Sequence, residues 1–190
     1  MFACRIEPAR MTAEEVYESV TNGGASDFAA AVDIFDRFGP WCLIGGLAVN
    51  CYTEPVYTVD ADFVIVSEHL AEVQAALSKA GFSLTKFPHS VNAKRPQSRL
   101  SLQLSTDLRY QDFLSRAARR EVLGASVPVA SLEDLVRGKM WAWQDKERRL
   151  TKRKKDELDL IRLAEAHPAL RATLPPEIIK QLEDNESDSL

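Results

Sequence analysis

The sequence has 190 residues, enough for one domain with its own hydrophobic core, and this length excludes a small scaffold that depends on disulfides. With 45% hydrophobic and 27% charged residues, the composition is that of a globular protein rather than a disordered or collagen-like chain. No apolar run approaches the ~20 residues that span a bilayer, and the opening MFACRIEPAR lacks the continuous apolar segment of a signal peptide. We therefore expect a cytoplasmic protein with no membrane partner.

The charge is unevenly distributed along the chain. The formal net charge is −4, yet the segment 146–155 carries an excess of six positive charges. A block of this kind can bind a polyphosphate or an RNA backbone. A solvated helix start is the alternative, and the charge run alone favours it.

Two helices are predicted at the start of the chain. The first follows Thr12, because Thr12 and Glu15 match the capping-box pattern. The second follows Ser26 and carries apolar residues at helical spacing as far as Phe38, after which a Gly-Pro pair ends it.

Strands and helices then alternate. Apolar, β-branched or alternating residues predict strands at 41–44, 60–66 and 99–105 and a brief extended segment at 127–130. Helices are predicted between them after Ser67 and after Asp107.

The last third of the sequence is predicted to be helical. One helix follows Ser131, and a second carries the stripe of Asp156, Leu160, Leu163 and His167. We expect an α/β (α+β) fold, with a mixed sheet and flanking helices in a core over 1–130, a helical subdomain over 131–182 and a flexible acidic tail over 183–190.

Asp60 and Asp62 are the first candidates for chemistry. One residue separates them, so on a strand both carboxylates project from the same face. Two such acids repel each other unless a cation lies between them, and Mg²⁺ prefers one or two carboxylates together with phosphate and water oxygens. An acidic pair at a solvated strand end is the alternative, and the pair alone does not decide between them.

Gly45 and Gly46 lie between a predicted strand and a predicted helix start. Glycines at such a junction let backbone N–H groups approach a phosphate closely. An ordinary tight turn is the alternative. The spacing of GGLAVN does not match the dinucleotide-binding G-x-G-x-x-G pattern.

Three segments together resemble a known family. They are IGGLAVNCYTEPVYTVDADFVIV, LQLSTDLRYQDF and SLEDLVRGKMWAW with the following RRLTKRKKDELDLIRL. The chain resembles the AbiEii/AbiGii-toxin-type nucleotidyltransferases of the DNA polymerase β-like superfamily over roughly residues 38–170. The resemblance implies Mg²⁺ (or Mn²⁺) held by Asp60 and Asp62, a nucleoside triphosphate as donor, and transfer of a nucleotidyl group to an acceptor hydroxyl.

The resemblance also implies roles for further residues. It implies catalytic roles for Lys139 and for Asp156, which follows Lys155 as in the family's Lys-Asp signature, beside the two acids. With this activity we expect nucleotide contacts from Gly45, Gly46, Thr58, Lys139, Arg149 and Lys152. Stabilisation of the helix start through the helix dipole is the alternative role of Asp156 and Asp159. By helical spacing Lys139 interrupts an apolar stripe, so it either extends toward a triphosphate or lies at the margin of that stripe with its ammonium in water.

The sequence departs from the family pattern at two places. Val56 and Tyr57 stand where many members have an arginine, and the later strand offers Gln103 where a third carboxylate is usual. A glutamine cannot accept a proton, so Asp107 is the other candidate for this role.

Two functions remain open from the sequence. The first is a metal-dependent nucleotidyltransferase acting on an RNA, such as a tRNA, or on a protein hydroxyl, as the toxin of a toxin–antitoxin pair with a cognate antitoxin. The second is a weak or inactive nucleotide-binding or interaction module with the same fold, and the absence of an evident third carboxylate motivates it.

Overall fold

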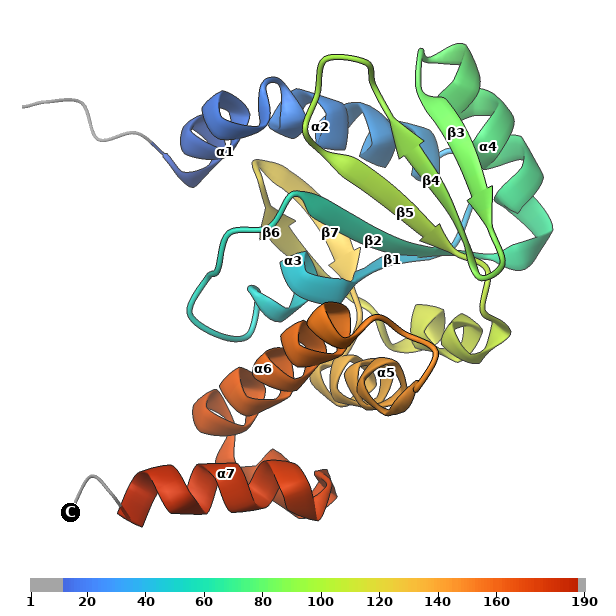
Figure 1. Ribbon diagram of the computed structural model, residues 1–190. Helices are drawn as coiled ribbons and strands as arrows, with labels where there is room; N and C mark the ends of the chain where they lie inside the picture. The colour runs from blue at the N-terminus through green and yellow to red at the C-terminus, as the bar shows by residue number, and fades with distance from the viewer. Residues whose placement is uncertain (1–11, 188–190) are drawn as a thin grey trace, which may run out of the picture.

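The computed structural model describes residues 12–187 and contains a seven-stranded mixed sheet with helices on both faces (Figure 1). The strands follow the order β3-β4-β5-β2-β1-β7-β6. Their bounds are β1 Trp41–Ile44, β2 Asp60–Ile65, β3 Ser83–Phe87, β4 Ser90–Lys94, β5 Ser101–Ser105, β6 Ala118–Val122 and β7 Ala125–Val129.

Strand β2 lies near the middle of this sheet. It pairs antiparallel with β1 and parallel with β5, while β3, β4 and β5 form an antiparallel meander at one side. On the other side β1 pairs parallel with β7, which forms a hairpin with β6. The two acids at the start of β2 therefore lie inside the sheet rather than at its edge.

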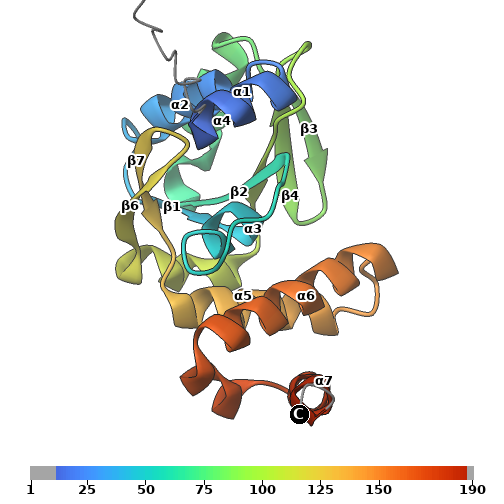
Figure 2. The same ribbon diagram turned by 90° about the vertical axis from the view of Figure 1, so that its left-hand side faces the viewer.

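Different sets of helices lie on the two faces of the sheet (Figures 1 and 2). One face carries α1 (Ala13–Thr21), α2 (Gly24–Phe35) and α4 (Leu70–Lys79). On the other side lie α3 (Gly45–Val49), then α5 (Leu132–Gln144) and α6 (Leu150–Ala166), with α7 (Pro176–Ser187) beyond them. Three 3₁₀ segments complete the chain, η1 (Ser67–His69), η2 (Leu108–Arg116) and η3 (Pro168–Thr173).

The main core lies between the sheet and α2 and α4. Strand alternation sends Ala61 and Phe63 of β2 into it, so Asp60 and Asp62 face the other way. Phe63 has no exposed surface, and its ring lies 4.9 Å from that of Phe35 on α2. A second buried cluster joins α3, α5, α6 and α7, with members Val49, Val136, Leu160, Leu163, Ala164, Leu170, Leu174, Ile178 and Leu182. Thus α5 and α6 hold a fixed position beside α3.

The predicted α/β class with a mixed sheet and a helical C-terminal part is confirmed. The capping box at Thr12 is present, and the Thr12 and Glu15 side chains each accept the other residue's backbone N–H. The division into 1–130, 131–182 and 183–190 stays a prediction, and residues 1–11 and 188–190 of its outer parts lie outside the described residues.

Several element boundaries differ from the prediction. Helix α2 begins at Gly24 rather than after Ser26, because the Thr21 hydroxyl accepts the Gly24 N–H. The segment after Asp107 is a 3₁₀ helix, although the Asp107 side chain caps it as expected. The acidic segment from Glu183, expected to be a flexible tail, is helical as far as Ser187.

Strands β3, β4 and β6 were not predicted. Most residues of β3 and β6 are exposed, since both lie at the edges of the sheet, so neither carries a clear apolar alternation. The pattern of β4 is weak because its inward residues are only Val91 and Ala93.

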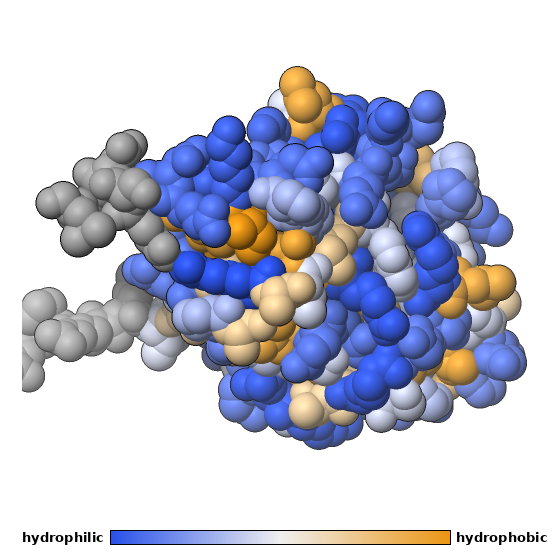
Figure 3. Space-filling view, turned by 90° about the horizontal axis from the view of Figure 1, so that it is seen from below, coloured by the Kyte–Doolittle hydropathy of each residue, from blue (hydrophilic) through white to orange (hydrophobic). Residues whose placement is uncertain are grey.

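Within residues 12–187, no helix combines the length and the apolar character needed to cross a membrane. Seen from below, the surface is mainly hydrophilic, with apolar side chains in separate small groups (Figure 3).

Candidate active site

The two acids of β2 face α3. Asp62 pairs in register with Ile44, the last residue of β1, so its carboxylate lies beside the turn into α3. Gly45 adopts a φ of 70° there, and a Cβ on it would collide with the Asp62 carboxylate. The absence of a side chain at Gly45 is therefore what lets Asp62 lie against the start of α3.

Gly46 has a different environment. A Cβ there would make ordinary contacts with Thr58, at 3.7 Å. The buried Thr58 hydroxyl in turn accepts the Asp60 N–H at 3.3 Å. Thr58 thus fixes the start of β2 and contacts the site through the backbone of Asp60.

Asp62 lies where two adjoining pockets meet. Both pockets are lined by Asp62, Gln103, Lys139, Arg148 and Asp156. The first, which we call the aromatic pocket, is also lined by Ile44, Gly45, Ser105, Tyr110, Phe113, Asp134, Leu135, Gly138 and Ala142. The second, the basic pocket, adds Gly46, Asp60, Lys152 and Lys155.

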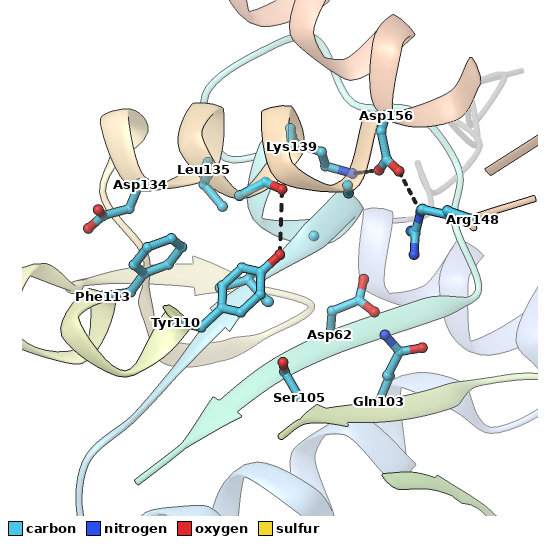
Figure 4. A pocket seen from close by; sticks show the side chains of 14 residues that line it. Asp62, Gln103, Ser105, Tyr110, Phe113, Asp134, Leu135, Lys139, Arg148 and Asp156 are labelled. Carbon is cyan, nitrogen blue, oxygen red and sulfur yellow. Dashed lines mark hydrogen bonds and ion pairs between the residues drawn. The ribbon is translucent and has the colours of Figure 1, made fainter. Parts of the chain in front are cut away.

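Figure 4 shows how these side chains are arranged. Asp62 and Gln103 rise from neighbouring strands, and Lys139, Asp156 and Arg148 lie across the cavity from them. The site is therefore enclosed between the sheet on one side and α5 and α6 on the other.

Lys139 is buried and paired with two acids of α6. Its Nζ lies 2.9 Å from Asp156 Oδ1 and 2.6 Å from Asp159 Oδ2. Burial opposes the charged form, but Asp159 and Asp156 outweigh it, so the pKa of Lys139 is raised and the side chain stays an ammonium. Lys139 is thus a fixed positive charge in the cavity wall, and it does not reach into water from the margin of a stripe.

Asp156 links this lysine to the basic segment. Its second oxygen, Oδ2, accepts the Arg148 Nε–H at 2.9 Å. Asp156 therefore holds Lys139 and Arg148 side by side, and both cations line the two pockets. Asp159 similarly accepts Arg162 Nη1 at 2.7 Å.

Some side chains of the basic segment 146–155 reach the site, and others contact residues elsewhere. Lys152 Nζ lies 3.2 Å from Asp60 Oδ2, and Lys155 Nζ lies 3.4 Å from the Thr58 hydroxyl. Lys154 instead pairs with Glu157 at 2.9 Å, and Arg153 donates to the Trp143 carbonyl. Three cations of the segment, Arg148, Lys152 and Lys155, therefore face the site.

Arg149, expected at the nucleotide, stands apart from that group. It is exposed at the position before the first residue of α6 and lines neither pocket.

The two candidates for the third acidic position, Gln103 and Asp107, lie in different places relative to the pockets. Gln103 on β5 pairs in register with Asp62 and lines both pockets. Asp107 lies beyond the strand, is paired with Arg109 at 2.6 Å, and lines neither pocket. The hydrogen bond from Arg109 lowers the pKa of Asp107 despite partial burial. The neighbour of Asp62 is thus an amide.

The donor set at Asp60 and Asp62 fits a magnesium ion with two protein carboxylates. The Asp62 carboxylate has no hydrogen-bond or ion-pair partner among residues 12–187. Burial raises its pKa, Lys139 lowers it and Asp60 raises it further, so a cation between the acids would stabilise the charged form. Within the same residues no group of three His, Cys, Asp or Glu side chains forms a metal site.

Sequence reasoning did not identify the aromatic pocket. Tyr110 and Phe113 lie on η2 with ring centroids 5.1 Å apart, and the Tyr110 hydroxyl approaches the Gly138 carbonyl at 3.5 Å. Burial raises the pKa of Tyr110 to about 12, so its hydroxyl stays protonated. The only signal in the sequence was the segment LQLSTDLRYQDF, which carries both rings just after the strand of Gln103.

Comparison with solved structures supports the fold. LnuA, a lincosamide antibiotic adenylyltransferase solved with lincomycin bound, matches with a TM-score of 0.52 and 14% identity over 74% of this chain and 96% of that one. The antibiotic-resistance factor ANT(2″)-Ia matches with a TM-score of 0.52 and 15% identity, over 86% and 97%. A nucleotidyltransferase-like antigenic protein from Paracoccidioides brasiliensis matches with a TM-score of 0.52 and 19% identity, over 88% and 89%. The chain therefore has a nucleotidyltransferase-like fold, as expected.

Comparison of sequences gives the family. None of the curated proteins searched matches this sequence. The model of the nucleotidyl transferase AbiEii toxin family, of type IV toxin–antitoxin systems, matches residues 30–188. This match spans most of the chain and includes every residue of the two pockets, so the chain belongs to the AbiEii family of nucleotidyl transferase toxins.

Proposed function

We propose that this protein is a metal-dependent nucleotidyltransferase that moves a nucleotidyl group from a nucleoside triphosphate to an acceptor hydroxyl. The observation that carries the proposal is that the basic pocket is lined by Asp60 and Asp62 together with Lys139, Arg148, Lys152 and Lys155. Two carboxylates facing a group of cations suit a metal–triphosphate complex, because the carboxylates can bind the positive metal ion and the cations can bind the negative phosphates.

The basic pocket is the site we assign to the triphosphate. Gly46 leaves the backbone at the start of α3 accessible, and Lys152 and Lys155 approach from α6. Lys139 and Arg148, held by Asp156, provide two further fixed positive charges. Charge-assisted hydrogen bonds from these groups would stabilise the negative charge that develops on the leaving pyrophosphate.

Asp60 and Asp62 would hold Mg²⁺ (or Mn²⁺), with the Gln103 amide oxygen as a neutral neighbour. When bound, the ion would neutralise phosphate charge and orient the triphosphate. Lys152 pairs with Asp60, and both side chains are partly exposed, so Lys152 would have room to contact a phosphate while Asp60 held the ion.

In the transfer itself, the acceptor oxygen forms a bond to the α-phosphorus. The bond from that phosphorus to the bridging oxygen breaks, pyrophosphate leaves, and the acceptor proton passes to water. We propose RNA, such as a tRNA, as the first candidate acceptor, with a protein hydroxyl as the other. As a toxin-family member in the cytoplasm, the protein would be controlled by a cognate antitoxin.

The direct test is incubation with each labelled nucleoside triphosphate, Mg²⁺ and cellular RNA or protein. We expect transfer by the wild type and a loss of about 100-fold or more in Asp60→Ala and Asp62→Ala, because metal charge stabilisation is worth several kcal/mol. Asp33→Ala, on the exposed side of α2, is the matched control. Absence of transfer together with unchanged Mg²⁺ and nucleotide affinity in both variants would refute the proposal.

One observation favours a second candidate function. Gln103 occupies the position beside Asp62, and an amide cannot act as a general base. A protein with this site can bind a nucleotide without ordinary turnover, and it would then act as a nucleotide-binding or antitoxin-binding module. Tight Mg²⁺–nucleotide binding without transfer to any acceptor would support this alternative.

A further inference from the structure

The strands that carry Asp62 and Gln103, which line both pockets, continue into an open face of the sheet. Gln103 of β5 is in register with Asp62 on one side and with Asn92 of β4 on the other, and Asn92 is in register with Thr85 of β3. Residues in register share a face, so a row of polar side chains runs from Asp62 to the edge of the sheet.

The neighbouring rows repeat this pattern. The same alternation and register place nine residues on this face, which we call the polar sheet face: Ser83, Thr85, Phe87, Ser90, Asn92, Lys94, Ser101, Gln103 and Ser105. The opposite face of the same strands carries the buried Val91, Ala93, Leu102 and Leu104, which pack in the main core. The sheet is therefore amphipathic, and its polar side adjoins the candidate active site.

The outer part of the polar sheet face is open to solvent. Ser83, Thr85 and Lys94 are exposed, Asn92 and Gln103 are half-buried, and the Phe87 side chain is 52% exposed. The helices on this side cover another part of the sheet, since α3 lies against β1 and β2, with α5 and α6 beyond it (Figures 1 and 2).

The polar sheet face combines available hydrogen-bonding groups with one positive charge and one aromatic ring. Among residues 12–187, the side chains of Thr85, Ser101 and Gln103 have no hydrogen-bond partner, so their donors and acceptors are available. The nine residues include Lys94 and no acid. Phe87 adds an exposed aromatic ring at the far end.

We propose that the polar sheet face binds unpaired nucleotides of an RNA acceptor and leads its 3′ end to Asp62. An aromatic ring on an open sheet stacks on a base, and hydroxyl and amide groups bind base edges and 2′-hydroxyls. The lack of acids and the adjoining Arg148 and Lys152 suit a phosphate backbone. The placement of the RNA 3′ end at Asp62 rests on the proposed function, whereas the binding of RNA to the polar sheet face does not.

A protein acceptor fits this surface less well. Apart from Phe87 the face has no large apolar side chain to anchor a partner, and protein interfaces depend on such anchors. Paired RNA also fits poorly, because its bases are not available to Phe87.

The test measures binding of a fluorescent, short single-stranded RNA to the full chain, without nucleotide. We expect Phe87→Ala to weaken binding about tenfold, as loss of one stacked base does. We expect Lys94→Ala to lower the slope of log affinity against log salt by about one. Lys86→Ala on the other face of β3 and Leu108→Ala at an exposed apolar site on η2 are the matched controls and should change neither.

Binding of labelled nucleotide with Mg²⁺ is measured on the same variants and should stay unchanged. This separates the two proposals, because RNA binding that depends on Phe87 and Lys94 supports the polar sheet face even if no transfer occurs. Equal binding of duplex and single-stranded RNA with no effect of Phe87→Ala would overturn the inference. Transfer to RNA at the wild-type rate and affinity by a variant carrying both Phe87→Ala and Lys94→Ala would also overturn it, as would transfer to protein alone.

Discussion

Lys152 and Asp60 are 92 residues apart in the sequence, and their side chains meet at 3.2 Å in the lining of the basic pocket. This ion pair joins α6 to the first residue of β2. It also distinguishes Lys152 from Lys154, two residues on, which pairs with Glu157.

We expect Lys152→Ala to weaken Mg²⁺–nucleotide affinity about tenfold, because a hydrogen bond to a charged group is worth roughly 1.5–3 kcal/mol. Lys154→Ala, the matched control, should leave that affinity unchanged. Both variants should unfold within about 1 kcal/mol of the wild type, since exposed ion pairs contribute little. Isothermal titration and urea denaturation measure the two quantities, and equal loss of affinity in both variants would show that the basic segment acts only through its total charge.

A second prediction concerns Gly45 and Gly46, which are adjacent but not equivalent. Alanine at Gly45 meets both a positive φ and the Asp62 carboxylate. We expect Gly45→Ala to destabilise the fold by about 1–3 kcal/mol and to reduce nucleotide affinity by displacing Asp62.

Gly46→Ala serves as its control, because its new methyl group only touches Thr58 at an ordinary distance. Its free energy of unfolding should stay within about 1 kcal/mol of the wild type. Similar unfolding midpoints for the two variants in urea would contradict the close packing of Asp62 against Gly45.

The third prediction is that Lys139 stabilises the fold as well as the site. Lys139→Met would remove the cation that Asp156 and Asp159 share and leave each buried acid with one arginine partner, Arg148 or Arg162. Breaking a buried pair in this way costs about 3–5 kcal/mol. Lys154→Met, which removes an exposed lysine, should cost less than about 1 kcal/mol.

The pH dependence of the unfolding free energy is an independent test of the charge on Lys139. Because the folded pKa of Lys139 is raised, its contribution to stability is fully present below the unfolded pKa of about 10.4 and is lost as pH rises through the folded value. The difference in unfolding free energy between wild type and Lys139→Met should therefore narrow only in strongly alkaline solution. A difference that is already lost near neutral pH would show that Lys139 is not charged in the fold.

These contacts show which parts of the site the sequence could predict. Asp60 and Asp62 were identifiable because strand alternation fixes their common side, and Lys139 because it interrupts an apolar stripe. Asp159 was not predicted to contact Lys139, although it lies three residues from Asp156 and thus on the same face of α6. A buried lysine needs a partner, so the spacing alone could have suggested this pair.

The polar sheet face could not be predicted in the same way. Its existence depends on the pairing of β3, β4 and β5, and that pairing is a tertiary property. The exposed strand β3 carries no apolar alternation, so nothing in the local pattern of Thr85 or Phe87 shows that they extend the row of Gln103 and Asp62.

The last prediction concerns Gln103 itself. Gln103→Asp would place a carboxylate directly opposite Asp62 in the ladder between β2 and β5. Without a metal, three acids at one face repel each other, so we expect the variant to unfold at a lower temperature than the wild type. Mg²⁺ should then stabilise the variant more than the wild type, because ion binding to the folded state adds to its stability.

The same variant decides between the two proposed functions. A third carboxylate can accept the acceptor proton, and a general base contributes roughly 100-fold or more to a rate. Relative to the wild type, we expect transfer to rise by about that factor in Gln103→Asp and not to rise in Gln103→Asn, which retains the amide. A wild type that already turns over at ~1 s⁻¹ or faster, with no gain in the variant, would show that the amide suffices and that the inactive-module alternative is wrong.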